Sequence, residues 1–315
     1  MKRFIRIGVI TAWPDDDWHS ARLLEACSHR ADAVAIDPAV LAARVDEGGI
    51  TVLAGAVPAS EFDAFVLARG LGRAGDPDLQ FEIYRSLEGA GALIVNRLEP
   101  LLSAQDKFRT SWLLTRAGLP TPRAAVAQTG ADAEVALAAL GECVAKPMAG
   151  SLGEGVEKLR PDADGRRIVA ERAARDGAVY LQSYVPHPGR DLRVFVVGGR
   201  ARAGIARHAA PGEWRTNVSG GGRAEPLMLG PAIASVAESA TVALGLDYAG
   251  VDLVMGPEGP VVLEVNGNPS WQGILEATGL DMAEVIAEHV LGRALRRRKA
   301  SDHIVRGRTT GAIHG

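Results

Sequence analysis

Residues 251–269 read Val-Asp-Leu-Val-Met-Gly-Pro-Glu-Gly-Pro-Val-Val-Leu-Glu-Val-Asn-Gly-Asn-Pro. Two apolar runs, rich in β-branched residues, flank a Gly/Pro-rich turn, which is typical of a hairpin of two strands. Buried strands normally exclude acids and amides, yet Asp252, Glu264 and Asn266 lie inside these runs. The three polar residues therefore mark either a functional site or a solvated edge.

The register of this hairpin decides what the three polar side chains can do together. Side chains alternate between the two faces of a strand, so Glu264 and Asn266 point the same way. A five-residue loop from Gly256 to Pro260 places Asp252 opposite Glu264, whereas a four-residue loop places it on the other face. Two carboxylates and an amide oxygen on one face suit Mg²⁺, which prefers oxygen ligands. An edge hairpin with solvated acids is the alternative.

A second constellation lies upstream, where an apolar strand ends in Lys146 and a glycine-rich loop follows. Glycines let backbone N–H groups approach phosphate oxygens, and the lysine adds a compact positive charge. The order differs from a Walker A loop, because the lysine precedes the glycines and no Gly-Lys-Ser/Thr opens a helix. An ordinary hairpin turn is the competing interpretation. The loop residues expected to cover phosphate are Gly150, Ser151, Gly153 and Gly155.

The rest of the chain combines an α/β and an α+β part, which predicts a multidomain protein. Near the N-terminus, strands alternate with helices and favour a largely parallel sheet. From residue 123 to 184 the order is strand, helix, strand, glycine-rich turn, strand, helix, strand. The expected segments are an N-terminal α/β substrate domain at 1–105, a central lid at 106–186, a C-terminal domain with the metal site at 187–300 and a flexible tail at 301–315.

Further motifs stand in order between about Asn96 and Leu291. With the two constellations they resemble the ATP-grasp superfamily, and within it the RimK-like α-L-glutamate ligase family. The resemblance implies an ATP-grasp fold preceded by an N-terminal α/β (pre-ATP-grasp) domain. The motifs are Asp106-Lys107, Gly118-Leu-Pro-Thr-Pro122, Lys146-Pro and its loop, Leu181-Gln-Ser-Tyr-Val185, Gly189-Arg-Asp-Leu-Arg193, Arg207, Arg215-Thr-Asn217, Gly220-Gly-Gly222, Gly250-Val-Asp252 and Leu263-Glu-Val-Asn266.

The resemblance also implies a nucleotide site. Lys107 and Lys146 would contact the phosphates of ATP, and Asp191 would hold the ribose. Arg215 and Asn217 would lie near the phosphates. The hinge residues expected against adenine are Gln182, Ser183, Tyr184 and Val185.

Two features depart from the family pattern near the hinge. Ser183 stands where related sequences commonly have an acid, so adenine contact there would rest on the main chain. The connection 186–189 is also short, which leaves the assignment of Asp191 less secure than that of the metal ligands.

The same resemblance implies the metal and substrate residues. Asp252, Glu264 and Asn266 would hold two Mg²⁺ ions, with Mn²⁺ as a substitute. Arg193 and Arg207 would face the acid substrate, and Arg207 and Arg215 would be catalytic. Both Arg193 and Arg207 would equally suit phosphate.

The reaction implied is ATP-dependent ligation. A carboxylate that attacks ATP must approach an anionic phosphate, so Mg²⁺, Lys146 and Arg215 are needed to offset the repulsion. An amine then displaces phosphate from the acylphosphate, and a closed lid excludes water. No serine or cysteine nucleophile is required.

Substrate identity is the least determined prediction. We expect an amino acid, L-glutamate first, and a small carboxylate acceptor of the pterin or deazaflavin coenzyme type, or a protein C-terminus. A glutathione- or dipeptide-type peptide synthetase, a pure acid kinase and a non-catalytic nucleotide-binding regulator are the alternatives. The family resemblance also implies a homo-oligomer, a dimer or tetramer.

The composition limits which other classes of protein the chain can belong to. The 315 residues carry a net charge of −3, 47% apolar and 23% charged residues, which is typical of a soluble globular protein and argues against nucleic-acid binding. No signal peptide or membrane-length apolar run is apparent, so neither membrane nor export is expected. Cys27 and Cys143 show no metal spacing and are expected to be reduced core thiols of a cytoplasmic protein.

Several residues keep two interpretations. Asp17 is expected to cap the helix that starts at Trp18. Arg69 and Arg73 follow a strand whose carboxyl end is a common ligand site, so they would hold a substrate carboxylate or form a basic loop. Trp271 would stack on a substrate or pack in the core.

Overall fold

The computed structural model describes residues 4–73, 75–148, 155–210, 212–214, 216 and 223–310, with side chains described up to residue 300. The chain divides into two compact units. Unit 1 contains Met1–Leu98 and Asp281–Gly315, and unit 2 contains Glu99–Leu280. The finer division into four segments stays a prediction. Mixed helices and sheets confirm the predicted fold class.

Unit 1 is built on a parallel sheet with the strand order β2-β1-β6-β7. Its strands bury apolar side chains such as Ile7, Val9 and Val66 completely, which accounts for the continuous apolar runs in the sequence. The strands are β1 Arg6–Ile10, β2 Asp32–Ile36, β6 Ala64–Leu67 and β7 Ile94–Val95. The helices between them are α1 Trp18–Ser28 and α2 Pro77–Gly89. The alternation predicted for this region is confirmed, and Asp17 caps α1 by accepting from the Ser20 N–H at 2.8 Å.

A second, antiparallel sheet of unit 1, in the order β3-β4-β5, was not predicted. It interrupts the β-α alternation between β2 and β6. Its sequence signal was the run Asp46-Glu-Gly-Gly49 between two stretches of strand length, which is a hairpin turn. Its elements are β3 Leu41–Asp46, β4 Gly49–Ala54 and β5 Val57–Pro58, flanked by the 3₁₀ turns Pro38–Val40 and Ala59–Glu61.

The C-terminal helix α9, Met282–Thr310, belongs to unit 1 and packs against α1. It runs well beyond Leu291, where the motif region of the sequence ends. A polar contact within unit 1 holds this extension, because the Arg298 guanidinium donates to the Asp63 carboxylate at 2.6 Å. The basic run near residue 298 therefore includes a packed arginine, which the charge pattern alone did not indicate.

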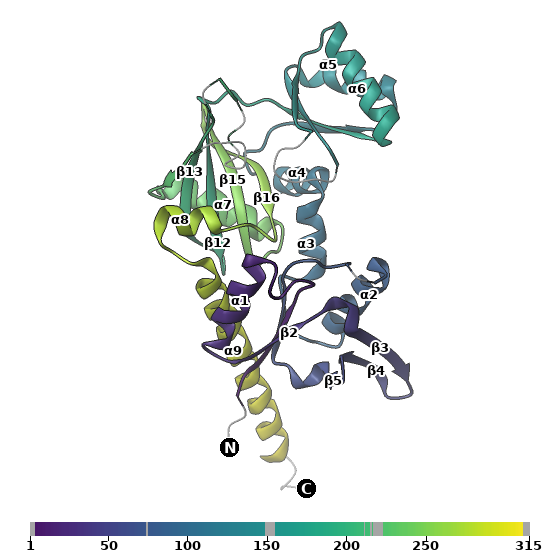
Figure 1. Cartoon of the computed structure of the whole chain (residues 1–315), viewed down its shortest axis with the longest axis vertical. Helices are drawn as coiled ribbons and strands as arrows, with labels where there is room; N and C mark the ends of the chain where they lie inside the picture. Colours follow the sequence, from purple (N-terminus) through teal and green to yellow (C-terminus); the bar gives the residue numbers. More distant parts are fainter. Residues whose placement is uncertain are drawn as a thin grey trace. The chain divides into compact units, whose positions relative to one another are not determined.

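Unit 2 begins with two helices, α3 Leu98–Gln105 and α4 Lys107–Arg116. The following α+β lid has the antiparallel strand order β10-β9-β11-β8, with α5 and α6 packed on it (Figure 1). Its core joins Leu137, Val169 and Leu181, all buried. The element order predicted for 123–184 is confirmed. The elements are β8 Ala124–Ala127, α5 Gly130–Leu140, β9 Cys143–Lys146, β10 Glu157–Leu159, α6 Ala163–Asp176 and β11 Val179–Ser183.

The remainder of unit 2 is an antiparallel sheet in the order β14-β13-β12-β15-β16, covered by α7. The long strands β12 and β15 are buried along most of their length, so polar residues on them are exceptional. The elements are β12 Arg190–Val197, β13 Arg200–His208, β14 Arg223–Pro226, α7 Pro231–Ala243, β15 Tyr248–Gly256, β16 Gly259–Asn266 and α8 Gln272–Thr278.

The hairpin β15–β16 has the predicted pairing of its acids but not the predicted turn. Asp252 lies opposite Glu264, as expected, but Gly256 pairs with Gly259, so the turn is shorter than five residues. Gly259 makes this turn possible, because its φ of 127° is unfavourable for a side chain. A register shift next to Asp252 then restores the pairing, with Leu263 as the additional residue. The pairing of Asp252 with Glu264 thus depends on a bulge.

Candidate active site

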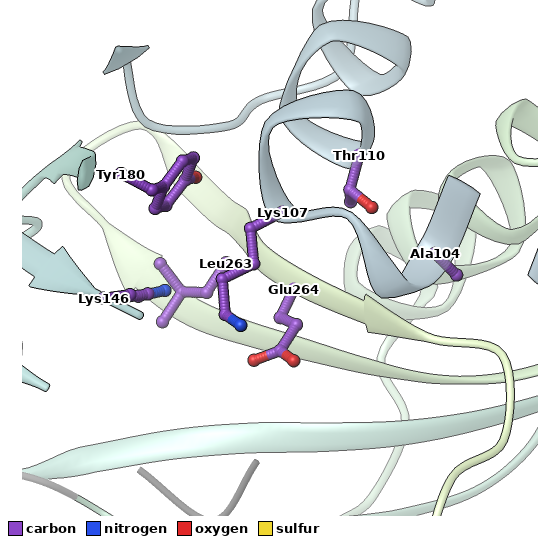
Figure 2. A pocket seen from close by; sticks show the side chains of 7 residues that line it. All are labelled: Ala104, Lys107, Thr110, Lys146, Tyr180, Leu263 and Glu264. Atoms are coloured by element: carbon purple, nitrogen blue, oxygen red, sulfur yellow. The ribbon is translucent and has the colours of Figure 1, made fainter. Parts of the chain in front are cut away.

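A hollow in unit 2 collects the two lysines and one acid singled out in the sequence. Figure 2 shows the amino groups of Lys107 and Lys146 and the Glu264 carboxylate directed toward the same space. Lys107 is the first residue of α4, whose N-cap is Asp106, while Lys146 ends β9 and Glu264 lies on β16. Two ammonium groups facing one carboxylate favour an anion such as phosphate. The lining residues are Ala104, Lys107, Thr110, Lys146, Tyr180, Leu263 and Glu264.

Lys146 is fixed by its lid neighbours. Its ammonium nitrogen donates to the Gln182 side-chain oxygen at 2.7 Å, and the Gln182 amide in turn donates to the Leu263 carbonyl at 3.3 Å. Burial lowers the pKa of Lys146, Glu264 opposes that shift, and the charge of Lys107 adds to it. A nearby anion would therefore be stabilised by this lysine and would raise its pKa.

Tyr180 lines the hollow but was missed from the sequence. It pairs with Lys146 across the lid sheet, and its hydroxyl lies 2.9 Å from the Ser111 hydroxyl. The available signal was strand periodicity, since Tyr180 and Gln182 are two residues apart and share one face of β11. Thr110 and Ala104 carried no comparable signal, because they enter the hollow through the packing of α3 and α4.

Beside the hollow, four charged side chains on neighbouring strands form a buried cluster, here called the charge cluster: Asp191, Arg193, Arg207 and Asp252. The Arg193 guanidinium binds Asp252 with two bonds of 2.7 Å. The Arg207 guanidinium binds Asp191 at 2.7 and 2.6 Å and approaches Asp252 to 3.1 Å. The Thr216 hydroxyl also donates to Asp191, at 2.5 Å. Two acids and two arginines thus balance their charges inside the sheet.

The pKa shifts in this cluster follow from that pairing. Burial alone would raise the pKa of Asp252, but Arg193 and Arg207 outweigh it and hold the pKa at about 2. For Arg207, burial lowers the pKa, and the charges of Asp252 and Asp191 more than reverse this. Asp252 and Arg207 are therefore ionised at neutral pH. The predicted roles of Asp191 toward ribose and of both arginines toward the acid substrate stay proposals.

The residues predicted to bind metal form a donor set that fits Mg²⁺. Asp252 and Glu264 are a cross-strand pair, and Asn266 pairs with Gly250 two positions further along β16. In the part of the chain that the structure describes, no group of three or more His, Cys, Asp or Glu side chains is placed to hold a metal. A Mg²⁺ ion here would therefore need phosphate and water oxygens to complete its shell, which is its usual coordination.

The hinge residues connect the lid to β12. The Ser183 N–H donates to the Arg123 carbonyl at 2.8 Å and the Tyr184 N–H to the Glu142 carbonyl at 2.9 Å, so both amides are used within the lid. The buried Ser183 hydroxyl, by contrast, has no hydrogen-bond partner among the described residues. An unsatisfied polar atom at this position fits a hinge that receives a polar ligand such as adenine.

Tyr184 carries a cationic neighbour. The Lys158 ammonium lies 4.3 Å from the Tyr184 ring centre and 5.9 Å from that of Trp214, and the two rings meet edge to face. Of the other predicted residues, Gly155 is described and has a left-handed φ of 66°. The other five residues predicted near the phosphates lie outside the described residues: Gly150, Ser151, Gly153, Arg215 and Asn217.

Three further predictions concern residues outside the hollow. Trp271 is buried, with its ring edge to face on Phe195 at 6.2 Å, which favours the packing interpretation. Cys27 and Cys143 are buried free thiols, as predicted, and burial raises their pKa values to about 12 and about 11. Among the described residues, no helix is both long and apolar enough to cross a membrane.

Comparison with known proteins gives a family match. The family model of the RimK-like ATP-grasp domain matches residues 104–290. The chain is 31% identical over 326 residues to the tetrahydromethanopterin:alpha-L-glutamate ligase of Methanosarcina acetivorans, covering 90% of this chain and 98% of the other. It is 33% identical over 215 residues to a probable alpha-L-glutamate ligase of Legionella pneumophila strain Corby, covering 67% and 71%.

A solved structure shares the fold. The ATP-grasp ligase PsnB, complexed with minimal precursor, Mg, and ADP, superposes with a TM-score of 0.71 at 21% identity. The superposition covers 91% of this chain and 98% of that chain. At this level of identity the likeness concerns the fold alone.

Proposed function

The chain belongs to the RimK-like ATP-grasp family of ATP-dependent ligases, and on this premise we propose that it joins the amine of L-glutamate to a carboxylate of a small coenzyme acceptor of the pterin or deazaflavin type. One observation carries the proposal: the similarity to a tetrahydromethanopterin:alpha-L-glutamate ligase extends over nearly the whole of both chains. A similarity limited to the ATP-binding domain would support only the ATP chemistry.

ATP would be held by groups that the structure describes. Lys107 and Lys146 would bind the phosphates in the hollow, because their amino groups face the same space. The hinge from Gln182 to Val185 would receive adenine, and Asp191 the ribose. Arg215 and Asn217, predicted near the phosphates, complete the proposal from the sequence.

The family uses ATP and Mg²⁺. We propose that Asp252, Glu264 and Asn266 would hold two such ions, with Mn²⁺ as a substitute. Bound Mg-ATP supplies the phosphoryl group that activates the acceptor carboxylate as an acylphosphate, which the glutamate amine then attacks. The residues of the chain contribute positive charge, orientation and exclusion of water. Lys146 neutralises phosphate charge at a fixed point, since Gln182 orients it.

Arg193 and Arg207 would serve two functions in this proposal. Both bind Asp252, so they hold a metal-ligand carboxylate ionised and fix its direction. A cation at Asp252 would compete with those contacts, and a guanidinium displaced from Asp252 would then be available to the acid substrate.

The test is ADP release by the purified protein with Mg-ATP and L-glutamate across a panel of acceptors, read together with product mass. The panel contains pterin coenzymes, deazaflavin coenzymes and short peptides that end in glutamate. A mass increase of one glutamyl residue on one acceptor, lost in Glu264→Gln, is the expected result. Arg44→Gln is the control, because Arg44 is an exposed arginine of unit 1.

Other outcomes identify the alternatives. ADP release that needs acid but no amine indicates an acid kinase. Transfer of another amino acid indicates a peptide synthetase, and ATP binding with no turnover under any pairing indicates a regulator. The cytoplasmic location and the homo-oligomeric state, dimer or tetramer, stay predictions; light scattering of the purified protein tests the second.

A further inference from the structure

The strand order of unit 1 points to a ligand site within this unit. In the parallel sheet β2-β1-β6-β7, the chain leaves β1 toward β2 on one side and later returns to β6 on the other side. The connections after β1 and β6 therefore diverge at their carboxyl ends. In open α/β sheets, ligands bind outside the carboxyl ends of the strands at such a topological switch point.

One arginine at this position has an unused donor. Arg69 follows β6 directly, and its Nη2 atom is buried and has no hydrogen-bond partner among the described residues. No carboxylate of the described residues forms an ion pair with it. Buried polar atoms are almost always paired in folded proteins, so an orphaned guanidinium nitrogen needs an explanation. An anionic ligand that accepts a hydrogen bond from this nitrogen would provide that explanation.

The backbone around Arg69 is held in place before any ligand arrives. The Ala12 N–H donates to the Arg69 carbonyl at 3.0 Å, which ties the end of β1 to the end of β6. Gly70 has a φ of 77°, and a Cβ there would meet the Ala12 side chain at 2.6 Å. This position thus requires glycine, and the arginine is presented from a fixed turn.

The neighbouring charges leave the Arg69 donor available. Asp17 accepts from the Ser20 N–H as the cap of α1, and Asp281 is bound by Arg22. His19 lies close by, and burial together with Arg69 lowers its pKa to about 4, so it is neutral at physiological pH. The two acids that act on His19 together with Arg69 are therefore engaged in other contacts.

An aromatic and a second cation complete the surface. The Arg73 guanidinium lies 4.7 Å from the Trp13 ring centre, and Trp13 follows β1 as Arg69 follows β6. Gln80, buried on α2, holds this loop by accepting from the Gly72 N–H at 2.9 Å and donating to the Arg73 carbonyl at 3.0 Å. The two arginines on the loop after β6 suit a carboxylate, and the indole ring after β1 suits a flat or apolar part of the same ligand.

We propose that the carboxyl edge between β1 and β6, formed by Trp13, His19, Arg69, Gly70 and Arg73, binds a carboxylate of the acceptor that is not consumed in the reaction. Arg69 would donate to this carboxylate through Nη2. The inference rests on the proposed function for the identity of the ligand as an acceptor, but the carboxylate site itself is argued from unit 1 alone.

The acceptor is favoured over the other substrates for two reasons. The family match covers residues 104–290 and so does not include this edge, whereas the residues predicted to bind ATP lie inside the match. The carboxylate that becomes activated is converted into an acylphosphate and then into an amide, so a carboxylate that stays bound to Arg69 throughout the reaction must be another one. An acceptor with at least two carboxylates, one reacting and one anchoring, satisfies both conditions.

Direct binding tests the site without turnover. The probe is N-acetyl-L-glutamate, a dicarboxylate with no free amine, titrated calorimetrically into the full chain without nucleotide. Loss of a charged hydrogen bond should weaken binding about 10- to 100-fold in Arg69→Gln. Arg69→Lys, which retains the charge but not the fork, should fall in between, and Arg44→Gln should bind as the wild type.

Two results would overturn the inference: equal affinity for Arg69→Gln and the wild type, or no binding of the probe to the wild type. Inorganic phosphate, titrated in parallel, distinguishes the anion class; binding as tight as that of the dicarboxylate would contradict a carboxylate site. Unchanged circular dichroism and Tm in Arg69→Gln would show that the variant is folded.

Kinetics then relate the site to the reaction. With an acceptor identified by product mass, Arg69→Gln should raise the KM for that acceptor about 10- to 100-fold while the KM values for ATP and L-glutamate stay within about twofold. A KM change for ATP instead would contradict a role toward the acceptor. If the wild type transfers glutamate to no acceptor, the proposed function fails while the calorimetric result still decides the carboxylate site.

Discussion

Two arginines of this protein, Arg207 and Arg69, differ in how their donors are used. Arg207, on β13 in unit 2, is buried and binds both Asp191 and Asp252. Arg69, after β6 in unit 1, has a buried Nη2 without any partner among the described residues. The first arginine is saturated by the folded chain, and the second is not.

The difference indicates two kinds of function. A saturated guanidinium between two acids controls charge and direction inside the sheet, so its removal affects folding before it affects a ligand. An unsaturated guanidinium contributes little to folding, because none of the described acids pairs with it, but it retains its full capacity for an incoming anion. The following predictions test this contrast.

The largest effect is expected for Arg207→Met. The change leaves Asp191 and Asp252 buried without their shared cation, which costs about 3–5 kcal/mol in the free energy of unfolding. Urea unfolding at pH 7 measures it. The matched control is Arg200→Met on the same strand. The Arg200 guanidinium is exposed and comes no closer to Glu238 than 3.9 Å, so this variant should change the free energy of unfolding by less than about 0.5 kcal/mol. Equal effects in both variants would remove the contrast.

The next effect is expected for Lys146→Met in the hollow. The variant removes a fixed positive charge from the phosphate site, which should lower kcat about 100- to 1000-fold. Stopped-time assays of ADP and amide product measure it. Lys299→Met, at an exposed position of α9, serves as the control. A loss smaller than tenfold would mean that Lys146 is not a phosphate ligand.

Acid should reduce the stabilisation that the charge cluster gives to unit 2. The folded pKa of Asp252, about 2, lies below the unfolded value of about 3.9, so its stabilisation is present above that value and is lost as pH falls toward 2. Of roughly 2–3 kcal/mol in total, about half should be lost between pH 6 and pH 3. Unfolding curves at both pH values measure the loss. Asp252→Asn should show a correspondingly shallower dependence, and an unchanged slope would count against the pairing.

The smallest effect is expected for Arg69→Gln on stability. Because its Nη2 makes no hydrogen bond, the substitution should alter the free energy of unfolding by less than about 0.5 kcal/mol. Thermal and urea unfolding check this value. Destabilisation comparable to that of Arg207→Met would show that Arg69 is structural after all, and the proposed carboxylate site would lose its main support.

Much of the architecture followed from local patterns. The parallel alternation of unit 1, the lid order from 123 to 184 and the hairpin with its two acids were all predicted from periodicity and turn residues, because each depends on neighbours in the sequence. Lys146 was identified in the same way, whereas Lys107 was predicted only from the family resemblance. The antiparallel β3–β5 sheet was missed although Asp46-Glu-Gly-Gly49 carried its turn signal.

By itself, the sequence determined the family and the ATP-dependent ligase chemistry, and it predicted the residues that would carry this chemistry, since motif order and spacing are properties of the chain. Tertiary structure alone decided the bulge at Leu263, the contacts of Arg193 and Arg207 with Asp252, the continuation of α9 onto Asp63 and the position of Arg69 at a switch point. Each of these depends on which strand or helix lies beside which. Such pairings join residues far apart in the chain, and no local pattern encodes them.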